Sequence, residues 1–349
     1  MLESLQYLRA IASLAVVFVH LQPPLERLGL TARWLQTGAF GVDIFFVLSG
    51  FLIFITTYNK GGDFLGSFYR KRWLRIVPLY WMITTFVLLL LLGLPQLVKS
   101  GEPDIWHIVA SYLFLPAAHP TLGSLEPLFV PGWTMNYEVF YFLLWGLVLF
   151  LPRRTRAPVY GGIMLTLVVI GLLAQSKQPF VAFYTSPIML EFVFGVVLGV
   201  WYREAPPAPR WCGWALLCIG FFALFFPPEY TNHGQRLIQR GIPAFMVLAG
   251  AVVLERTRPV PRFGVFALLG DASYSTYLTH SIILSAVGQV FVKLAMPATV
   301  TTGVLYGVAG VAASIAGSII FHKLVEKRVL QMMRDTPVPA PKPVAQSGK

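Results

Sequence analysis

Charged residues are scarce in this sequence. They make up 12% of the 349 residues, whereas a soluble domain carries about 25%. Hydrophobic residues make up 56% of the chain and the mean hydropathy is +0.68. The two cysteines, Cys212 and Cys218, lie in one apolar segment without a Cys-x-x-Cys spacing, so neither a disulfide framework nor a zinc site is expected. The composition predicts a polytopic membrane protein and argues against a soluble domain.

The sequence also lacks several catalytic motifs. It contains no glycine-rich phosphate loop, no His-Glu-x-x-His and no Gly-x-Ser-x-Gly, so the enzyme classes built on those motifs are not expected. We expect no metal and no cofactor. Any catalysis must then use a histidine inside the membrane, together with an acidic residue that supports it as a base.

What the chain has in abundance is apolar stretches, each approaching the roughly 20 residues that cross a bilayer. We predict ten spans at about 4–22, 38–57, 76–94, 133–151, 159–175, 186–202, 211–227, 241–255, 271–292 and 300–321. With the N-terminus inside, 20 of the 27 Lys and Arg residues fall on the inner side, as the positive-inside bias requires. We therefore predict an all-α membrane bundle with both termini cytoplasmic, and the net charge of +12 calls for no nucleic acid.

Three segments fall outside this pattern. Residues 105–115 are apolar but too short to cross, so we expect either an interfacial or re-entrant outer helix that covers a site, or a plain connector. Residues 322–335 resemble a basic helix on the inner membrane surface. We assign residues 1–335 to one membrane domain and expect the Pro-rich tail, 336–349, to be disordered.

The stretch from Leu5 to His20 carries one arginine, Arg9, near its start and ends in a histidine. As a helix, it separates Arg9 and His20 by about 16 Å and places them within about 20° of one face. Ionisable groups inside a membrane usually line a polar cavity, so this face is predicted to be one wall of a catalytic tunnel. The alternatives are that Arg9 is a positive-inside anchor and that His20 bonds to a neighbouring helix.

Asp43 lies near the outer end of the second predicted span, as His20 does in the first. A carboxylate beside an imidazole fixes its tautomer and raises its basicity, which a general base needs. Asp43 could instead cap the helix start. The neighbouring pair Ser49-Gly50 is interpreted as a close contact between helices.

Basic residues crowd the start of the third predicted span. Arg72 and Arg75 are three residues apart and share a helix face, with Arg70 just before them. Guanidiniums bind phosphate groups bidentately, so these three are candidate ligands of a phosphate-bearing donor. The alternative is that their charge only sets the topology.

The fourth predicted span carries Glu138 about one and a half turns from its start, and a carboxylate at that depth is expected to be paired or functional. Trp133, Asn136 and Tyr141 surround it along the chain, either as a sugar-binding rim or as an ordinary aromatic belt.

The ninth predicted span adds Tyr277 and His280, neighbours on one helix face, as further acceptor contacts or as packing groups. Glu191 is a buried acid without an assigned role. Three more histidines fall in predicted outer loops and are interpreted as surface residues: His107, His119 and His233.

Taken together, these motifs resemble the acyltransferase 3 family of integral membrane acyltransferases, in the family's order and over nearly the whole chain. The matching features are Arg9 with His20, GVDIFFVLSGFLI at 41–53, Arg72 with Arg75, GWTMNYEVFY at 132–141 and DASYSTYLTH at 271–280. The block Asn136-Tyr137-Glu138, followed by Val139 where the common variant has a second glutamate, is similar to that of bacterial exopolysaccharide O-acetyltransferases of the succinoglycan type.

The resemblance implies an acyl-CoA donor, most simply acetyl-CoA, bound from the cytoplasm, and a carbohydrate acceptor on a lipid-linked or exported polysaccharide. It places Arg72 and Arg75 near the CoA phosphates, Arg9 along the donor path and His20 at the transfer point, with Asp43 or Glu138 in support. It implies the bacterial cytoplasmic membrane as the location and polysaccharide assembly proteins as partners. A transporter or flippase for a lipid-linked saccharide remains the alternative.

Overall fold

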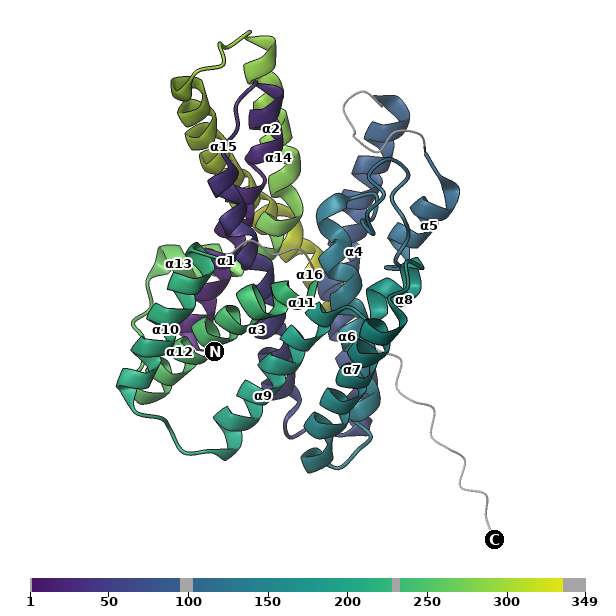
Figure 1. Cartoon of the computed structure of the whole chain (residues 1–349), viewed down its shortest axis with the longest axis vertical. Helices are drawn as coiled ribbons and strands as arrows, with labels where there is room; N and C mark the ends of the chain where they lie inside the picture. The colour runs from purple at the N-terminus through teal and green to yellow at the C-terminus, as the bar shows by residue number, and fades with distance from the viewer. Residues whose placement is uncertain (1, 95–102, 228–232, 335–349) are drawn as a thin grey trace.

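Helices make up every regular element that the computed structural model describes, in residues 2–94, 103–227 and 233–334. Figure 1 shows the bundle that they form. The α-helices are α1 (Glu3–Val19), α2 (Gln22–Arg27), α3 (Phe40–Thr57), α4 (Leu65–Gly93), α5 (Ile105–Tyr112), α6 (Trp133–Val148), α7 (Arg153–Ala174), α8 (Pro179–Tyr184), α9 (Leu190–Glu204), α10 (Arg210–Phe225), α11 (His233–Arg236), α12 (Ile242–Thr257), α13 (Gly264–Asp271), α14 (Ser273–Lys293), α15 (Val300–Phe321) and α16 (Lys327–Arg334). Short 3₁₀ turns are η1 (Arg33–Ala39), η2 (Gly62–Phe64), η4 (Val130–Gly132) and η5 (Pro187–Met189), and π-helical turns are η6 (Leu237–Gly241) and η7 (His322–Glu326).

The predicted all-α membrane bundle is confirmed, with a helix at each of the ten predicted positions. Within the described residues, eight helical segments are long and apolar enough to cross a membrane. The predicted spans at 133–151 and 211–227 form shorter helices of 16 residues each, α6 and α10. The full count of ten and the cytoplasmic termini stay predictions, and the tail at 336–349 lies outside the described residues.

Helix α4 begins earlier than predicted, at Leu65 instead of residue 76. Its first three turns contain several basic and aromatic residues, and the arginines among them are strong helix formers. The early start makes Arg72 and Arg75 part of one rigid helix with the apolar part of the span, and Pro78 lies inside it. The basic side chains are thus held at fixed positions on the helix.

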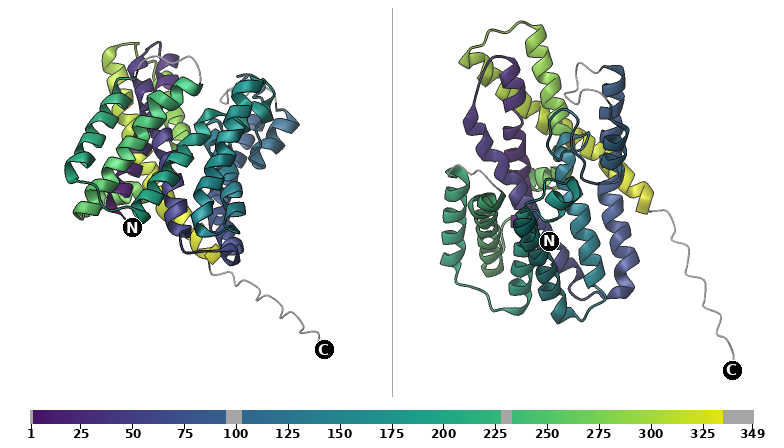
Figure 2. Two further views of the ribbon diagram at one scale, coloured as in Figure 1. Left: turned by 60° about the horizontal axis from the view of Figure 1, so that its bottom comes forward. Right: turned by 45° about the vertical axis from the view of Figure 1, so that its right-hand side comes forward.

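Helix α1 is at the centre of the bundle and packs against α3, α12, α13 and α14. Helices α3 and α9 cross at very short distance, which Gly50 and Gly195 permit because they have no side chain. A Cβ at Gly50 would overlap the carbonyl oxygen of Phe192, and one at Gly195 would overlap that of Val47. The predicted close helix contact at Gly50 is confirmed. The two views in Figure 2 show α10 and α12 side by side at the edge of the bundle.

Two groups of helices diverge from this centre. Figure 1 shows α2, α14 and α15 together on one side and α4 and α5 on the other. Helix α5 begins at an Asp104 cap, whose carboxylate accepts a hydrogen bond from the His107 amide at 2.6 Å. The chain from 113 to 132 then leads to the start of α6. A helix in the segment 105–115 is therefore confirmed, and its position at the membrane surface stays a prediction.

Candidate active site

A small cavity of about 70 Å³ lies among α1, α3, α4, α6 and α14, with three arginines and one glutamate in its wall. We call it the arginine cavity. Its lining residues are Arg9, Val42, Phe45, Phe46, Leu48, Ser49, Leu52, Arg72, Arg75, Ile76, Thr134, Met135, Glu138, Ser273, Tyr274 and Tyr277. A water needs about 10–15 Å³ of such space, so the cavity has room for a few small groups or a slim chain.

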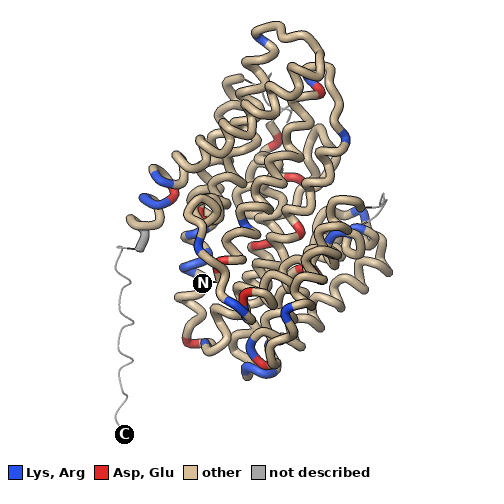
Figure 3. Tube along the Cα trace, turned by 90° about the vertical axis from the view of Figure 1, so that its left-hand side faces the viewer, with Lys and Arg blue, Asp and Glu red and all other residues tan. Residues whose placement is uncertain are grey.

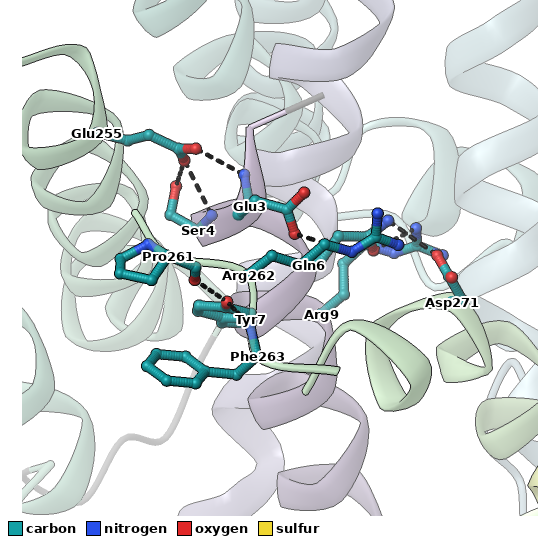
Figure 4. Close-up of polar contacts among 10 residues, drawn as sticks. All are labelled: Glu3, Ser4, Gln6, Tyr7, Arg9, Glu255, Pro261, Arg262, Phe263 and Asp271. Carbon is teal, nitrogen blue, oxygen red and sulfur yellow. Dashed lines mark hydrogen bonds and ion pairs between the residues drawn. The ribbon is translucent and has the colours of Figure 1, made fainter. Parts of the chain in front are cut away.

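Arg9 is the most deeply buried of the three arginines, with 9% of its surface exposed. Its Nη1 donates a hydrogen bond to Oε1 of Gln6 at 3.2 Å, and Gln6 in turn donates from Nε2 to Asp271 at 2.9 Å. Figure 4 shows Gln6 between Arg9 and Asp271. This chain of contacts ties the guanidinium to α13 and fixes its position in the wall.

The start of α1 is anchored by a carboxylate from α12. Glu255 accepts hydrogen bonds from the amides of Glu3, at 2.7 Å, and Ser4, at 2.9 Å, which otherwise have no partner in a first helical turn. Tyr7 adds a bond from its hydroxyl to the carbonyl of Pro261 and accepts one from the Phe263 amide (Figure 4). The start of α1, and with it Arg9, is therefore held on two sides.

Arg72 and Arg75 come from α4 and line the same cavity. The Arg72 guanidinium lies 5.0 Å from the centre of the Phe142 ring and donates to the Thr56 hydroxyl at 3.4 Å. Arg75 is exposed, whereas Arg72 is partly buried. The cavity wall thus carries three positive groups that differ in exposure, with Arg75 the most exposed and Arg9 the most buried.

Glu138, from α6, contributes the cavity's negative charge, and its Oε1 accepts a hydrogen bond from Ser49 at 3.3 Å. Among the described residues, no Lys or Arg nitrogen lies within 4.0 Å of this carboxylate. Figure 3 shows acidic positions inside the bundle as well as at its ends. Three guanidiniums facing one unpaired carboxylate leave the cavity with net positive charge, which suits an anionic ligand.

A second, larger cavity of about 560 Å³ lies between the two diverging groups of helices. We call it the histidine cavity. Its lining residues are His20, Pro23, Pro24, Arg27, Phe86, Val87, Leu90, His119, Leu122, Glu126, Leu128, Phe129, Val130, Pro131, Ser281, Ile282, Ser285, Ala286 and Gln289. The predicted spacing of Arg9 and His20 thus places each residue in the wall of a cavity, although the two cavities differ.

His20 caps the end of α1, and its Nδ1 lies 2.9 Å from the carbonyl oxygen of Val16. A carbonyl oxygen only accepts, so Nδ1 carries the proton and, in the neutral ring, Nε2 keeps a free lone pair. That is the form a general base needs. His280 lies beside it with ring centres 4.6 Å apart, and it repeats the same bond from Nδ1 to the Thr276 carbonyl oxygen at 3.0 Å.

The loop from 113 to 132 supplies two ionisable wall residues that were not predicted as site residues, His119 and Glu126. The Glu126 carboxylate accepts a hydrogen bond from Ser124 at 2.7 Å. The interpretation of His107 and His119 as surface residues is wrong: each is 2% exposed, and their rings meet with centres 4.9 Å apart. His107 also donates from Nε2 to the Glu126 carbonyl oxygen at 2.8 Å, which folds the loop back onto α5. The side chain of His233 lies outside the described residues.

Asp43 does not meet His20. It is fully buried and forms an ion pair with Arg236 at 2.9 Å, on a face of α3 that lines neither cavity. Its side chain makes no cap hydrogen bond at the start of α3 either. Glu191, also fully buried, lies against this pair. Any acidic support for His20 must therefore come from another residue, because Asp43 is held by a guanidinium elsewhere.

Five more predicted site residues line neither cavity. Trp133 packs on Phe46 and faces the Arg236 guanidinium, 5.7 Å from its ring centre. Asn136 donates to the carbonyl oxygen of Leu115 at 3.4 Å, and Tyr141 is buried against Phe192 with ring centres 4.4 Å apart. Arg70 precedes the cavity-lining arginines on α4. His280 reaches the site only through its contact with His20, and Tyr277 lines the arginine cavity.

Comparisons with known proteins identify the family to which this chain belongs. A family described as "Acyltransferase domain" matches residues 2–323. The exopolysaccharide production protein ExoZ of Rhizobium meliloti is 35% identical over 81% of this chain and 89% of its own length. The acyltransferase MdmB of Streptomyces mycarofaciens is 25% identical over 95% of this chain and 92% of its own length.

A third relative, the peptidoglycan O-acetyltransferase OatA of Listeria monocytogenes, is 27% identical over 81% of this chain, and the match covers 49% of OatA. No solved structure matches the chain. The family match extends over nearly all of the described bundle, both cavities included. This multi-pass membrane protein belongs to the acyltransferase family.

Proposed function

We propose that this protein transfers an acetyl group from cytoplasmic acetyl-CoA to a hydroxyl of a lipid-linked or exported polysaccharide, in the bacterial inner membrane. The observation that carries the proposal is the His20 tautomer: Nδ1 donates to the Val16 carbonyl oxygen, which leaves Nε2 as an acceptor in a side chain that lines a large cavity. The names of the relatives ExoZ and OatA support a polysaccharide acceptor and an acetyl group.

The donor phosphates are assigned to the arginine cavity. Arg75 is the most exposed of the three arginines, so we assign the phosphates to its side of the cavity, and the slim arm of the donor would extend towards the buried Arg9. Arg9 and His20 are about 16 Å apart along α1, a distance that the extended pantetheine arm of CoA suits. Arg70, which lines no part of the cavity, is left out of this assignment.

The chemistry assigned to His20 is general base catalysis. Nε2 takes the proton of the acceptor hydroxyl as its oxygen attacks the thioester carbonyl carbon, a C–O bond forms and the C–S bond breaks. The proton then passes to the thiolate sulfur, so the products are an O-acetyl ester and free CoA thiol. In the covalent variant, His20 itself carries the acetyl group between donor and acceptor.

The acceptor is assigned to the histidine cavity, whose walls differ in chemistry. Ser281, Ser285 and Gln289 recur every four residues along one face of α14 and offer hydrogen-bonding groups. Phe86 and Leu90 of α4 form an apolar wall. A saccharide attached to a lipid has both kinds of surface, which supports this class of acceptor.

The test is a His20→Ala variant assayed in membranes with acetyl-CoA and acceptor glycan. Loss of a general base lowers the rate by about 10²–10⁴-fold, so release of CoA thiol and acetylation of the glycan should fall together. His107→Gln is the control, because His107 lines neither cavity and glutamine can still donate to the Glu126 carbonyl oxygen. Full acetylation by His20→Ala would contradict the proposal.

Two further outcomes separate the alternatives. An acetyl adduct on the His20 peptide, trapped during turnover and found by mass spectrometry, would identify the covalent variant. A protein that moves a saccharide across the bilayer but releases no CoA thiol would be a transporter, and the acyl-transfer proposal would then fail.

A further inference from the structure

The arginine cavity and the histidine cavity are two separate spaces with different walls. No residue that lines one also lines the other among the described residues. The continuous polar tunnel predicted from the spacing of Arg9 and His20 is therefore interrupted in this structure. What lies between the two cavities determines how an acyl group reaches His20.

Tyr277 of α14 lies between the wall of the arginine cavity and the wall of the histidine cavity. Its ring lines the arginine cavity, and its hydroxyl lies 2.6 Å from the carbonyl oxygen of Pro131, a residue that lines the histidine cavity. A carbonyl oxygen only accepts, so the single phenolic proton goes to Pro131. The hydroxyl of Thr134 lies 2.7 Å from the Tyr277 oxygen and 3.4 Å from the same Pro131 carbonyl oxygen, so it completes this cluster.

The partition extends from Tyr277 towards the catalytic histidine. Tyr277 is 6% exposed, and its ring centre lies 5.9 Å from that of His280, which in turn contacts His20. Pro131 belongs to the 3₁₀ turn η4, at the end of the loop that walls the histidine cavity. The partition is thus a side chain of α14 bonded to the backbone at the start of α6.

Acyl transfer needs reacting atoms about 3–3.5 Å apart. A donor held by Arg9, Arg72 and Arg75 and a hydroxyl held beside His20 are on opposite sides of this partition. We propose that Tyr277 is a positioning residue that closes the path between the donor and acceptor cavities and must swing away from Pro131 for the acyl group to pass. This inference rests on the proposed function for its chemistry, and on the two cavities alone for its geometry.

A closed partition between the two cavities would protect the donor thioester from water. Water that reaches an activated thioester hydrolyses it, and closed sites suppress such side reactions. A partition that opens only for the acyl arm would keep water of the open histidine cavity away from the donor when no acceptor is bound. Tyr277 would then set the ratio of hydrolysis to transfer.

The first experiment compares Tyr277→Phe with Tyr306→Phe. Both remove a buried hydroxyl that donates to a backbone carbonyl, but Tyr306 bonds to Leu284 and lines neither cavity. A lost hydrogen bond shifts the opening equilibrium by up to about tenfold. CoA release without acceptor, relative to release with acceptor, should rise by up to that factor in Tyr277→Phe and stay unchanged in Tyr306→Phe. An unchanged ratio in Tyr277→Phe overturns the proposal.

The second experiment measures the partition without catalysis. In a Cys212→Ser, Cys218→Ser background, Ala286→Cys places a thiol in the wall of the histidine cavity. A small sulfonate-bearing methanethiosulfonate reagent, impermeant to lipid, is added to right-side-out and inside-out vesicles. With Tyr277 present, labelling should occur from the histidine-cavity face only, and Tyr277→Ala should add labelling from the other face.

Equal labelling from both faces with Tyr277 in place, or from one face in both variants, overturns the partition. If the unaltered protein releases no CoA thiol at all, the proposed function fails while the labelling result still stands. If Tyr277→Phe is inactive or poorly folded, the labelling experiment decides alone.

Discussion

Asp43 and Glu138 are both carboxylates in the apolar interior, and both were predicted from sequence to support catalysis. Their surroundings differ. Asp43 is fully buried and ion-paired with Arg236 at 2.9 Å, away from both cavities. Glu138 lines the arginine cavity with three guanidiniums, and no Lys or Arg nitrogen among the described residues comes within 4.0 Å of it.

The difference shows which buried charges are available to a ligand. A paired charge without adjacent space has its interaction satisfied by the protein, and breaking the pair leaves a desolvated charge. Charges held around a space without direct pairing keep their capacity to bind something else. By this argument the Asp43–Arg236 pair holds α3 to α11, and the arginine cavity is the site that we propose for an anionic donor.

The largest effect is expected from Arg236→Ala. Removing one partner of a buried ion pair costs about 3–5 kcal/mol, so the detergent-solubilised protein should unfold at a clearly lower temperature. The measurement is thermal unfolding, with the double variant Asp43→Asn, Arg236→Gln as the matched control. The double variant removes both charges of the pair together and should recover much of the stability. If both variants lose the same stability, the ion pair with Asp43 is not the source of the stability that Arg236 provides.

An intermediate effect is expected from Arg72→Ala. A hydrogen bond to a charged group contributes about 1.5–3 kcal/mol, which raises the KM for acetyl-CoA about 10- to 100-fold, while unfolding should change little. The KM for the acceptor should stay the same. Arg70→Ala tests the assignment, because Arg70 belongs to the same basic stretch but lines no cavity. An equal rise in KM for Arg70→Ala would refute the cavity as the donor site.

The smallest effect is expected from Gln6→Ala, which frees Arg9 from Asp271 without changing any charge. A single hydrogen bond contributes about 0.5–1.5 kcal/mol, so the KM for acetyl-CoA should rise about two- to tenfold. Asp271→Ala acts on the same chain of contacts and serves as a second variant. If both raise the KM and the double variant adds nothing further, Gln6 and Asp271 act together on Arg9.

Part of this site was predictable because it lies within single helices. The eleven-residue spacing of Arg9 and His20 and the three-residue spacing of Arg72 and Arg75 depend only on helix geometry. The structure places all four side chains in cavity walls. The apolar stretches likewise predicted a helix at each of ten positions, because a chain in lipid must satisfy its backbone hydrogen bonds internally.

His119 and Glu126 were missed for the opposite reason. They lie in a loop with no periodic signal, and only the fold of residues 113–132 onto α5 brings them to the cavity beside His20. The partner of Asp43 was also hidden, since Arg236 is 193 residues further along the chain. No local pattern in a sequence records such a pairing.

The sequence alone determined that this chain is a helical membrane protein, which residues carry its ionisable groups within the bilayer, and which of them share a helix face. Composition and helical periodicity suffice for that, because both are local properties. Only the tertiary structure decided that Asp43 is paired with Arg236, that the His20 Nε2 keeps its lone pair beside a large cavity, and that Tyr277 lines the arginine cavity while it bonds to a wall residue of the histidine cavity. Those facts depend on how helices pack against one another, and packing joins residues that the chain keeps far apart.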